Sequence, residues 1–224
     1  MSQVLEKLKP IVDKTIIKLS DPNFRKDPIG GRFAFVTSVI SSAYKRHGSI
    51  LEQAIVERLK ECKHLEVLIE EKFPISTKAS NLASLSGKDI DMAKTADLPF
   101  EQNNPSRTLQ IDCIVFNKKK RIISSYEIKR GNGHFDAGKK RSIRNDLLAT
   151  NFLLKNYGKY KKLNVKRAHS YIVCYYGVRA LPQPFSLIRE DLDNHFGASI
   201  IKEVDSVNNY FKNLLHKMID SKIG

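Results

Sequence analysis

Two acidic residues stand out in the segment from residue 109 to residue 129. Asp112 and Glu127 lie in two apolar runs that flank a lysine-rich turn, a pattern typical of a β-hairpin. A turn centred between Lys119 and Lys120 makes the two acids direct cross-strand partners, with Cβ atoms about 5 Å apart. Opposed like charges are unfavourable on a sheet, and a divalent cation between them would turn this repulsion into binding.

Lys129 extends this arrangement, because it lies two residues beyond Glu127 and therefore points to the same face of its strand. The two carboxylates and the backbone carbonyl of Ile128 are hard oxygen ligands of the kind that Mg²⁺ prefers. We therefore expect Asp112, Glu127 and Ile128 to bind Mg²⁺. Lys129 is expected to orient a metal-bound water or to stabilise charge on a phosphate. The alternative is a structural Asp–Lys or Glu–Lys pair at the end of a strand.

Both arms of this hairpin are apolar on both faces, which is typical of strands inside a sheet. Strand alternation places Ile114 and Phe116 on the side of Asp112, and Ile111 and Cys113 on the opposite side. Charge in the middle of a buried strand is rare unless it is paired or bound to a ligand. This context favours a functional site.

The composition favours an anionic partner. The 224-residue chain has 39 Lys and Arg against 24 Asp and Glu, a net charge of +15, and nucleic acid is a better candidate than a membrane. From the sequence we expect neither a membrane span nor a signal peptide. Its three cysteines are far apart, which predicts reduced thiols in the cytoplasm and no zinc or iron–sulfur site.

Basic residues are concentrated around the two acids. Residues 118–144 contain ten Lys and Arg against two acids. A solvated surface would also explain such a run, but a phosphate-binding surface accounts for its place beside the acids. The residues expected to bind DNA are Arg130, Asn132, His134, Lys139, Lys140, Arg141 and Arg144.

Hydrophobic periodicity predicts a core in the order helix, strand, strand, strand, helix, strand. Gly48 is expected to end one helix before the next begins at Ser49. The expected helices cover residues 3–19, 33–45, 49–61, 139–156, 190–195 and 206–221, and the expected strands outside the hairpin cover residues 65–75, 171–176 and 199–204. Residues 76–107 are expected to form a long polar loop with a short helix near residues 81–85.

This order, with an acid on the second strand and Glu-x-Lys on the third, resembles the PD-(D/E)XK nuclease superfamily over about residues 49–177. Asp112 matches the first acid of the motif, Glu127 the second acid and Lys129 the lysine. Ile111 stands where the family has proline. The resemblance implies an α/β fold with a restriction-endonuclease-like core, in which helices flank a mixed central sheet in αβββαβ order.

Many members of this superfamily also carry a glutamate on the helix before the sheet, and Glu52 is the candidate by position. The sequence Ser49-Ile-Leu-Glu52 fits a capping box equally well, in which Glu52 would bond back to the Ser49 amide. Both roles stay open at this point.

The resemblance implies a Mg²⁺-dependent endonuclease of double-stranded DNA, most like a type II restriction enzyme that acts as a homodimer without a nucleotide cofactor. It also implies one nuclease domain over residues 1–224, with helical additions at both ends of the core. One alternative is a structure-specific nuclease, such as a junction resolvase or a repair nickase. Another is a basic DNA-binding protein without catalytic activity, whose acids are structural.

Overall fold

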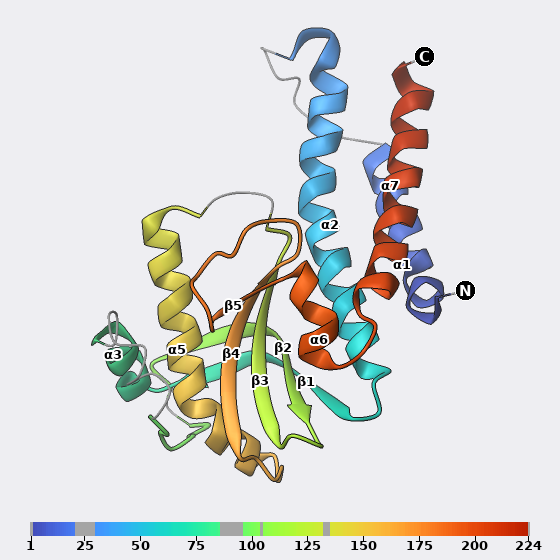
Figure 1. The fold of residues 1–224 in the computed structure, drawn as a ribbon. Helices are drawn as coiled ribbons and strands as arrows, with labels where there is room; N and C mark the ends of the chain where they lie inside the picture. The colour runs from blue at the N-terminus through green and yellow to red at the C-terminus, as the bar shows by residue number, and fades with distance from the viewer. Residues whose placement is uncertain (1, 21–29, 86–95, 104, 132–134, 224) are drawn as a thin grey trace. The chain divides into compact units, whose positions relative to one another are not determined.

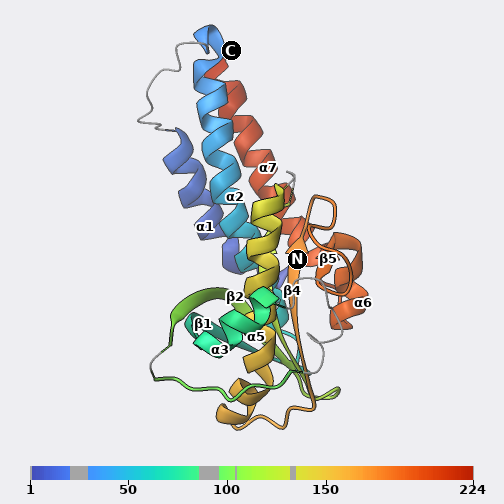
Figure 2. The same cartoon turned by 90° about the vertical axis from the view of Figure 1, so that its left-hand side faces the viewer.

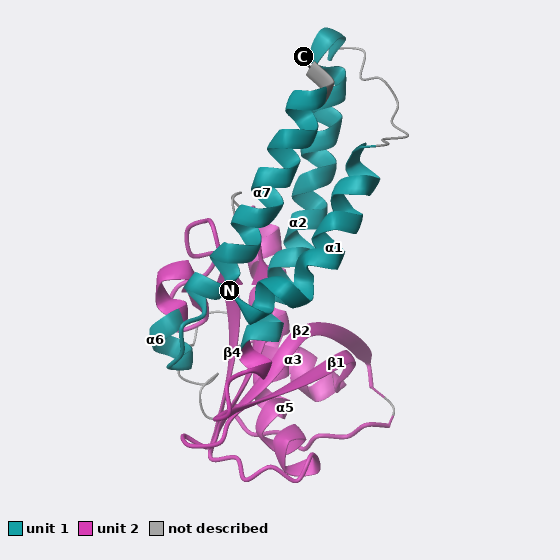
Figure 3. Ribbon diagram, turned by 90° about the vertical axis from the view of Figure 1, so that its right-hand side faces the viewer, with its two compact units in different colours: residues 1–58, 193–224 teal, residues 59–192 magenta. Residues whose placement is uncertain are grey.

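The structure is a computed structural model that describes residues 2–20, 30–85, 96–103, 105–131 and 135–223 (Figure 1). The chain divides into two compact units (Figure 3). The helical unit comprises residues 1–58 and 193–224, and the sheet unit comprises residues 59–192. The described ranges contain no helix that is long and apolar enough to cross a membrane. The expectation of one nuclease domain over the whole chain stays a prediction.

The sheet unit contains a five-stranded mixed sheet whose strands follow one another in chain order. These strands are β1 (Leu65–Ile75), β2 (Arg107–Asn117), β3 (Ile122–Lys129), β4 (Arg167–Cys174) and β5 (Ser186–Ile188). The first three strands pair antiparallel, whereas β3, β4 and β5 pair parallel. The expected α/β class and mixed sheet flanked by helices are confirmed. The sequence analysis missed β5, which has only three residues.

One face of this sheet is covered by α5 (Ala137–Tyr160), which connects β3 to the parallel strand β4 (Figures 1 and 2). Parallel neighbours require such a crossover, and a helix is its usual form. Apolar residues of α5 recur at helical spacing, and Ile143 and Leu147 pack with Ile114 in one hydrophobic cluster. The short helix expected near residues 81–85 is present as α3 (Thr77–Leu85), which packs against α5.

A bulge in β2 lies at Asp112. Leu68 of β1 pairs with Ile114, whereas Glu70 pairs with Ile111, so β2 has one residue more than β1 over this step. A bulge of this kind changes the alternation of side chains between the two faces. Ile111 consequently joins the same hydrophobic cluster as Ile114, and the expectation that it faces the other way is wrong.

The helical unit contains α1 (Gln3–Ser20), most of α2 (Ala34–Lys60), and α7 (Ile201–Ile223). Apolar residues of α1 are buried, and this helix packs along α7. The hydroxyl of Tyr210 on α7 donates a hydrogen bond of 2.8 Å to Asp13 on α1. This unit also contains η1 (Gly31–Phe33) and most of α6 (Leu192–Phe196), whereas η2 (Arg189–Asp191) belongs to the sheet unit.

The expected break at Gly48 is wrong, because α2 continues through it as one helix of 27 residues. A glycine weakens a helix by about 1 kcal/mol relative to alanine, which buried neighbours such as Leu51 can offset. Ser49 lies within this helix, and its hydroxyl accepts a 3.3 Å hydrogen bond from Gln53. The capping-box role of Glu52 is therefore wrong.

The short strand expected at residues 199–204 is wrong as well, because α7 begins at Ile201. The side chains of Ile200, Val204 and Val207 have no exposed surface. Their spacing of four and three residues places them on one side of a helix, so the apolar residues that suggested a strand belong to a helical face.

Candidate active site

The two acids of the candidate site lie where the regular pairing of β2 with β3 ends. The last regular pair is Cys113 opposite Tyr126, and Asp112 and Glu127 are the next residues on the two strands. At this point the backbone N–H of Ile128 donates a hydrogen bond of 2.6 Å to the carboxylate of Asp112. A side-chain oxygen thus continues the contact between the strands beyond their last backbone pair.

Asp112 is held in an environment that disfavours its charged form. Its side chain is only 8% exposed. Burial raises the pKa of Asp112, and the charge of Glu127 raises it further. The charge of Lys129 and the hydrogen bond from Ile128 act in the opposite direction but are weaker.

Lys129 brings its ammonium group to both acids. Its Nζ lies 2.5 Å from Oε1 of Glu127 and 3.8 Å from Oδ2 of Asp112. The side chains of Lys129 and Glu127 are 37% and 32% exposed, so solvent reaches both of them. The expected convergence of two carboxylates and one ammonium is therefore present in the structure.

These residues offer a small set of oxygen atoms that could bind a metal ion. In a paired strand the N–H and C=O of one residue point to the same side, so the carbonyl of Ile128 points toward β2, as its N–H does. Within the described ranges, no group of three or more His, Cys, Asp or Glu side chains could hold a metal ion. Two carboxylates and a carbonyl suit Mg²⁺, which retains several water ligands and uses few protein ligands.

Glu52 lies on α2 in the helical unit, whereas Asp112, Glu127 and Lys129 lie in the sheet unit. A capping box is excluded at this position, and the role of Glu52 as a fourth site residue stays a prediction.

A pocket of about 220 Å³ adjoins Glu127 and lies between the sheet and α5. Ile111, Ile143 and Leu147 give it an apolar wall, while Lys139 and Asp146 of α5 supply charge. This is where the expected DNA-binding helix and the candidate catalytic strand meet, because Lys139 and Glu127 line the same pocket.

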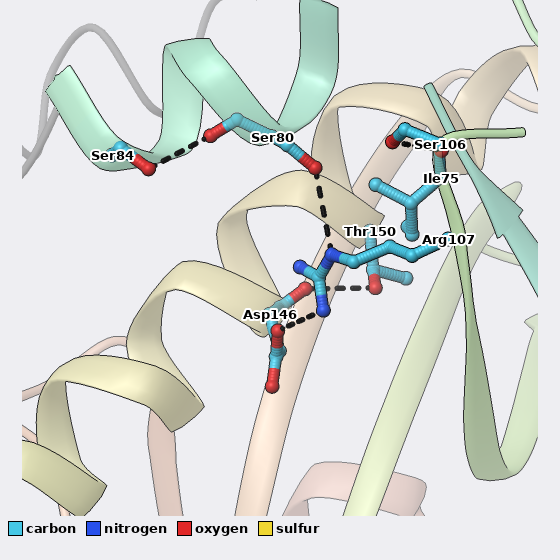
Figure 4. A network of polar contacts seen from close by, with 7 residues as sticks. All are labelled: Ile75, Ser80, Ser84, Ser106, Arg107, Asp146 and Thr150. Carbon is cyan, nitrogen blue, oxygen red and sulfur yellow. Dashed lines mark hydrogen bonds and ion pairs between the residues drawn. The ribbon is translucent and has the colours of Figure 1, made fainter. Parts of the chain in front are cut away.

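Asp146 belongs to a polar network that the sequence analysis missed (Figure 4). Arg107, the first residue of β2, forms an ion pair of 2.7 Å with Asp146 and reaches Ser80 of α3 at 3.5 Å. The Thr150 hydroxyl donates to the carbonyl of Asp146 at 2.8 Å. Asp146 is the only acid of α5, and a lone acid in a basic helix was the available signal.

The expected DNA-binding residues are distributed around the start of α5. Asp136 caps this helix by accepting a 2.8 Å hydrogen bond from the backbone N–H of Lys139. Lys140 and Arg141 are exposed, whereas Arg144 is partly buried, and its Nε has no hydrogen-bond partner among the described residues. Arg130 lies over the ring of Tyr176 at 5.6 Å, and Asn132 and His134 lie outside the described residues.

Gly131, two residues after the end of β3, has a conformation that favours glycine, with φ at +78°. A Cβ at this position would come within 2.8 Å of the Cβ of Cys174 on β4. The backbone N–H of Tyr176 donates to the carbonyl of Arg130 at 2.8 Å, which holds the two strand ends together. Close packing against β4 therefore accounts for the glycine.

Comparisons of the chain with protein-family models, with curated proteins and with solved structures find no match.

Proposed function

We propose that the protein is a Mg²⁺-dependent endonuclease that hydrolyses phosphodiester bonds in double-stranded DNA. The observation that carries this proposal is the convergence of Asp112, Glu127 and Lys129, with the ammonium 2.5 Å and 3.8 Å from the two carboxylates. Two acids that can bind a metal ion and a lysine that can stabilise charge are suited to such a hydrolysis.

Each residue has a distinct role in this proposal. Asp112, Glu127 and the Ile128 carbonyl would hold Mg²⁺, which lowers the pKa of a bound water and polarises a phosphoryl oxygen. The hydrogen bond from Ile128 to Asp112 fixes the orientation of that carboxylate. Lys129 stabilises negative charge as it develops on the phosphate, because its ammonium lies beside both acids.

Charge supports nucleic acid as the substrate. The sheet unit has 25 Lys and Arg against 14 Asp and Glu, a larger excess than that of the helical unit. Such an excess favours a polyanion with many phosphates. Cutting both strands of a symmetric site requires two active sites related by a two-fold axis, so we propose a site-specific enzyme of the type II class that acts as a homodimer.

One observation favours a second candidate, a DNA-binding protein without catalytic activity. Asp112 accepts a backbone hydrogen bond, and Lys129 forms an ion pair with Glu127, so all three charged groups have structural partners. In that protein the acids would stabilise the hairpin end and would not bind Mg²⁺.

Incubation with supercoiled plasmid DNA tests these candidates. With Mg²⁺ the wild-type protein should cut the plasmid, and with a chelator it should not. Glu127→Gln should abolish cutting and preserve DNA binding, because glutamine is a poor Mg²⁺ ligand. Glu66→Gln is a matched control, since Glu66 lies at the other end of the sheet, where it pairs with Lys118 at 3.8 Å.

The cleavage products separate the nuclease classes. Discrete fragments from linear DNA indicate a site-specific enzyme, whereas cutting confined to four-way junctions or nicks indicates a structure-specific one. Mg²⁺-dependent cutting by Glu127→Gln at the wild-type rate would refute the site. Binding without cutting by the wild type on all of these substrates would favour the non-catalytic protein.

A further inference from the structure

Two basic turns lie side by side at the end of the sheet opposite the candidate active site. The turn between β2 and β3 has four basic residues at 118–121, and the segment from the end of α5 to the start of β4 has five within residues 159–167. In Figure 1 both segments lie at the lower end of the sheet, whereas α5 starts at the upper end. We call these nine residues the turn cluster.

Specific hydrogen bonds hold the two turns together. The backbone N–H of Lys166 donates to the carbonyl of Arg121 at 2.8 Å. The Nε of Arg121 donates to the carbonyl of Asn164 at 3.0 Å, and its guanidinium also bonds to the Asn164 side chain. The turn cluster is therefore one fixed surface assembled from two parts of the chain.

The turn cluster contains much more positive than negative charge. Residues 118–121 and 159–167 include no Asp or Glu. In the described part of the chain, Glu66 pairs with Lys118 at 3.8 Å and Glu70 pairs with Lys161 at 3.4 Å. The described residues show no ion pair for Lys119, Lys120, Lys162 or Lys166, all of which are exposed. Such a concentration of like charge repels itself, and a polyanion would relieve the repulsion.

Two of these basic residues occupy backbone positions that suit glycine better. Arg121 has φ at +56° and Lys162 has φ at +60°, in the left-handed region that strains residues with a Cβ. Each turn therefore keeps a long basic side chain where glycine would fit with less strain. Arg121 is half-buried, and its side chain holds the two turns together through Asn164, which explains its retention. Lys162 is exposed and shows no side-chain bond among the described residues, so a role in binding explains the choice there.

Distance separates the turn cluster from the candidate active site. Glu127 lies six residues beyond Arg121 along β3, which corresponds to about 20 Å along an extended strand. That is the length of about 6 base pairs of duplex. The basic run of residues 118–144, which is continuous in sequence, thus divides into two surfaces at opposite ends of the sheet.

We propose that the turn cluster is a second binding surface for the phosphate backbone of double-stranded DNA, separate from the surface at the start of α5. The choice of DNA as the polyanion rests on the proposed function, whereas the existence of a polyanion surface rests on the turn cluster alone. Duplexes that reach both ends of the sheet gain contacts that a duplex confined to the active site lacks.

The test measures binding of a duplex of about 30 base pairs, long enough to reach both surfaces, at increasing salt without Mg²⁺. In one variant, Lys119, Lys120, Lys162 and Lys166 are replaced by glutamine. The matched control replaces four exposed lysines of the helical unit and removes the same charge. These control positions are Lys14, Lys18, Lys212 and Lys217.

The turn-cluster variant should bind more weakly, and the slope of log K against log salt should decrease by up to about 3.6, or about 0.9 for each phosphate that the variant no longer neutralises. The control variant should retain the wild-type slope. At saturating DNA the turn-cluster variant should also retain the wild-type rate of Mg²⁺-dependent cleavage. If the wild type cuts no DNA, the nuclease proposal fails. The binding measurement still decides whether the turn cluster binds DNA.

Equal weakening in both variants would mean that only net charge matters and would overturn the proposal. So would wild-type affinity and slope in the turn-cluster variant. Vesicles of phosphatidylserine and phosphatidylcholine provide the last comparison. Loss of vesicle binding with unchanged DNA binding would assign the turn cluster to a membrane and overturn the proposal too. Circular dichroism and thermal unfolding of each variant establish that it is folded.

Discussion

Replacing Asp112 by asparagine separates the charge of this side chain from its hydrogen bond. The amide oxygen of asparagine can accept the Ile128 N–H, as Asp112 does at 2.6 Å. The negative charge, which burial and Glu127 both disfavour, is removed. Without Mg²⁺ and at neutral pH, Asp112→Asn should therefore have a higher free energy of unfolding than the wild type.

The sign follows from proton binding. The pKa of Asp112 is raised in the folded protein, so at a pH just above its ordinary value of 3.8 the folded state binds more protons than the unfolded state. Stability then decreases as pH rises through this window, up to the raised pKa. Asp112→Asn should not show this decrease in stability. Its free energy of unfolding should therefore exceed that of the wild type by the largest amount at a pH above the window.

Asp112→Ala is the matched comparison. Alanine removes the charge as well, but it leaves the Ile128 N–H without its acceptor, which costs about 1–3 kcal/mol. For a chain of this length each kcal/mol corresponds to a change in Tm of about 2–4 °C. Thermal unfolding without Mg²⁺ should give Asp112→Asn the highest Tm of the three proteins. Asp112→Ala should be less stable than Asp112→Asn by about 1–3 kcal/mol.

Mg²⁺ should change this order. A metal bound only to the folded wild type adds about 1.4 kcal/mol at ten times its dissociation constant, and neither variant can gain as much. The reasoning is refuted if Asp112→Asn is less stable than the wild type without Mg²⁺. It is also refuted if Mg²⁺ raises the Tm of all three proteins by the same amount.

Four further predictions concern other positions. Lys129→Met should reduce the cleavage rate by about 10²–10³-fold and should retain the Mg²⁺-dependent rise in Tm. Cutting at the wild-type rate would contradict the role of Lys129 in stabilising charge on the phosphate. Burial, together with Arg167, lowers the pKa of His169 from 6.5, so the unfolded state binds more protons as pH falls below that value and stability decreases. Urea unfolding between about pH 8 and pH 5 should show this decrease in the wild type and a flatter profile in His169→Gln. Gly48→Ala should raise the free energy of unfolding by about 0.5–1 kcal/mol, because the new Cβ meets no atom within 4 Å. Gly30→Ala should destabilise, since its Cβ would come within 2.8 Å of the Cα of Ala34, and denaturant unfolding measures both changes.

The parts of the site that could be predicted from the sequence are those fixed by local geometry. A hairpin with a short turn sets its own register, so the spacing of Asp112 and Glu127 around the turn was enough to place them on adjoining strands. The period of two residues along a strand then placed Lys129 beside Glu127. Neither step needed knowledge of any other element.

Contacts between distant segments explain what the sequence analysis missed. The bulge at Asp112 depends on the pairing of β2 with β1, which begins 47 residues earlier in the chain, at Leu65. The ion pair between Arg107 and Asp146 joins a strand to a helix that comes after another strand. Gly48 was misjudged for a related reason, because packing on both sides of a glycine can maintain a helix that local propensity would end.

The hydrogen bond that anchors Asp112 does not by itself account for a carboxylate at this position. Asparagine would accept the Ile128 N–H equally well, without a buried charge next to Glu127. Lys129 compensates only part of that charge, since the pKa of Asp112 is still raised. A site optimised for the stability of the metal-free chain would contain a neutral side chain here. The carboxylate at position 112 is therefore the strongest argument against a purely structural role, because a cation bound between Asp112 and Glu127 would offset the cost of burying this charge.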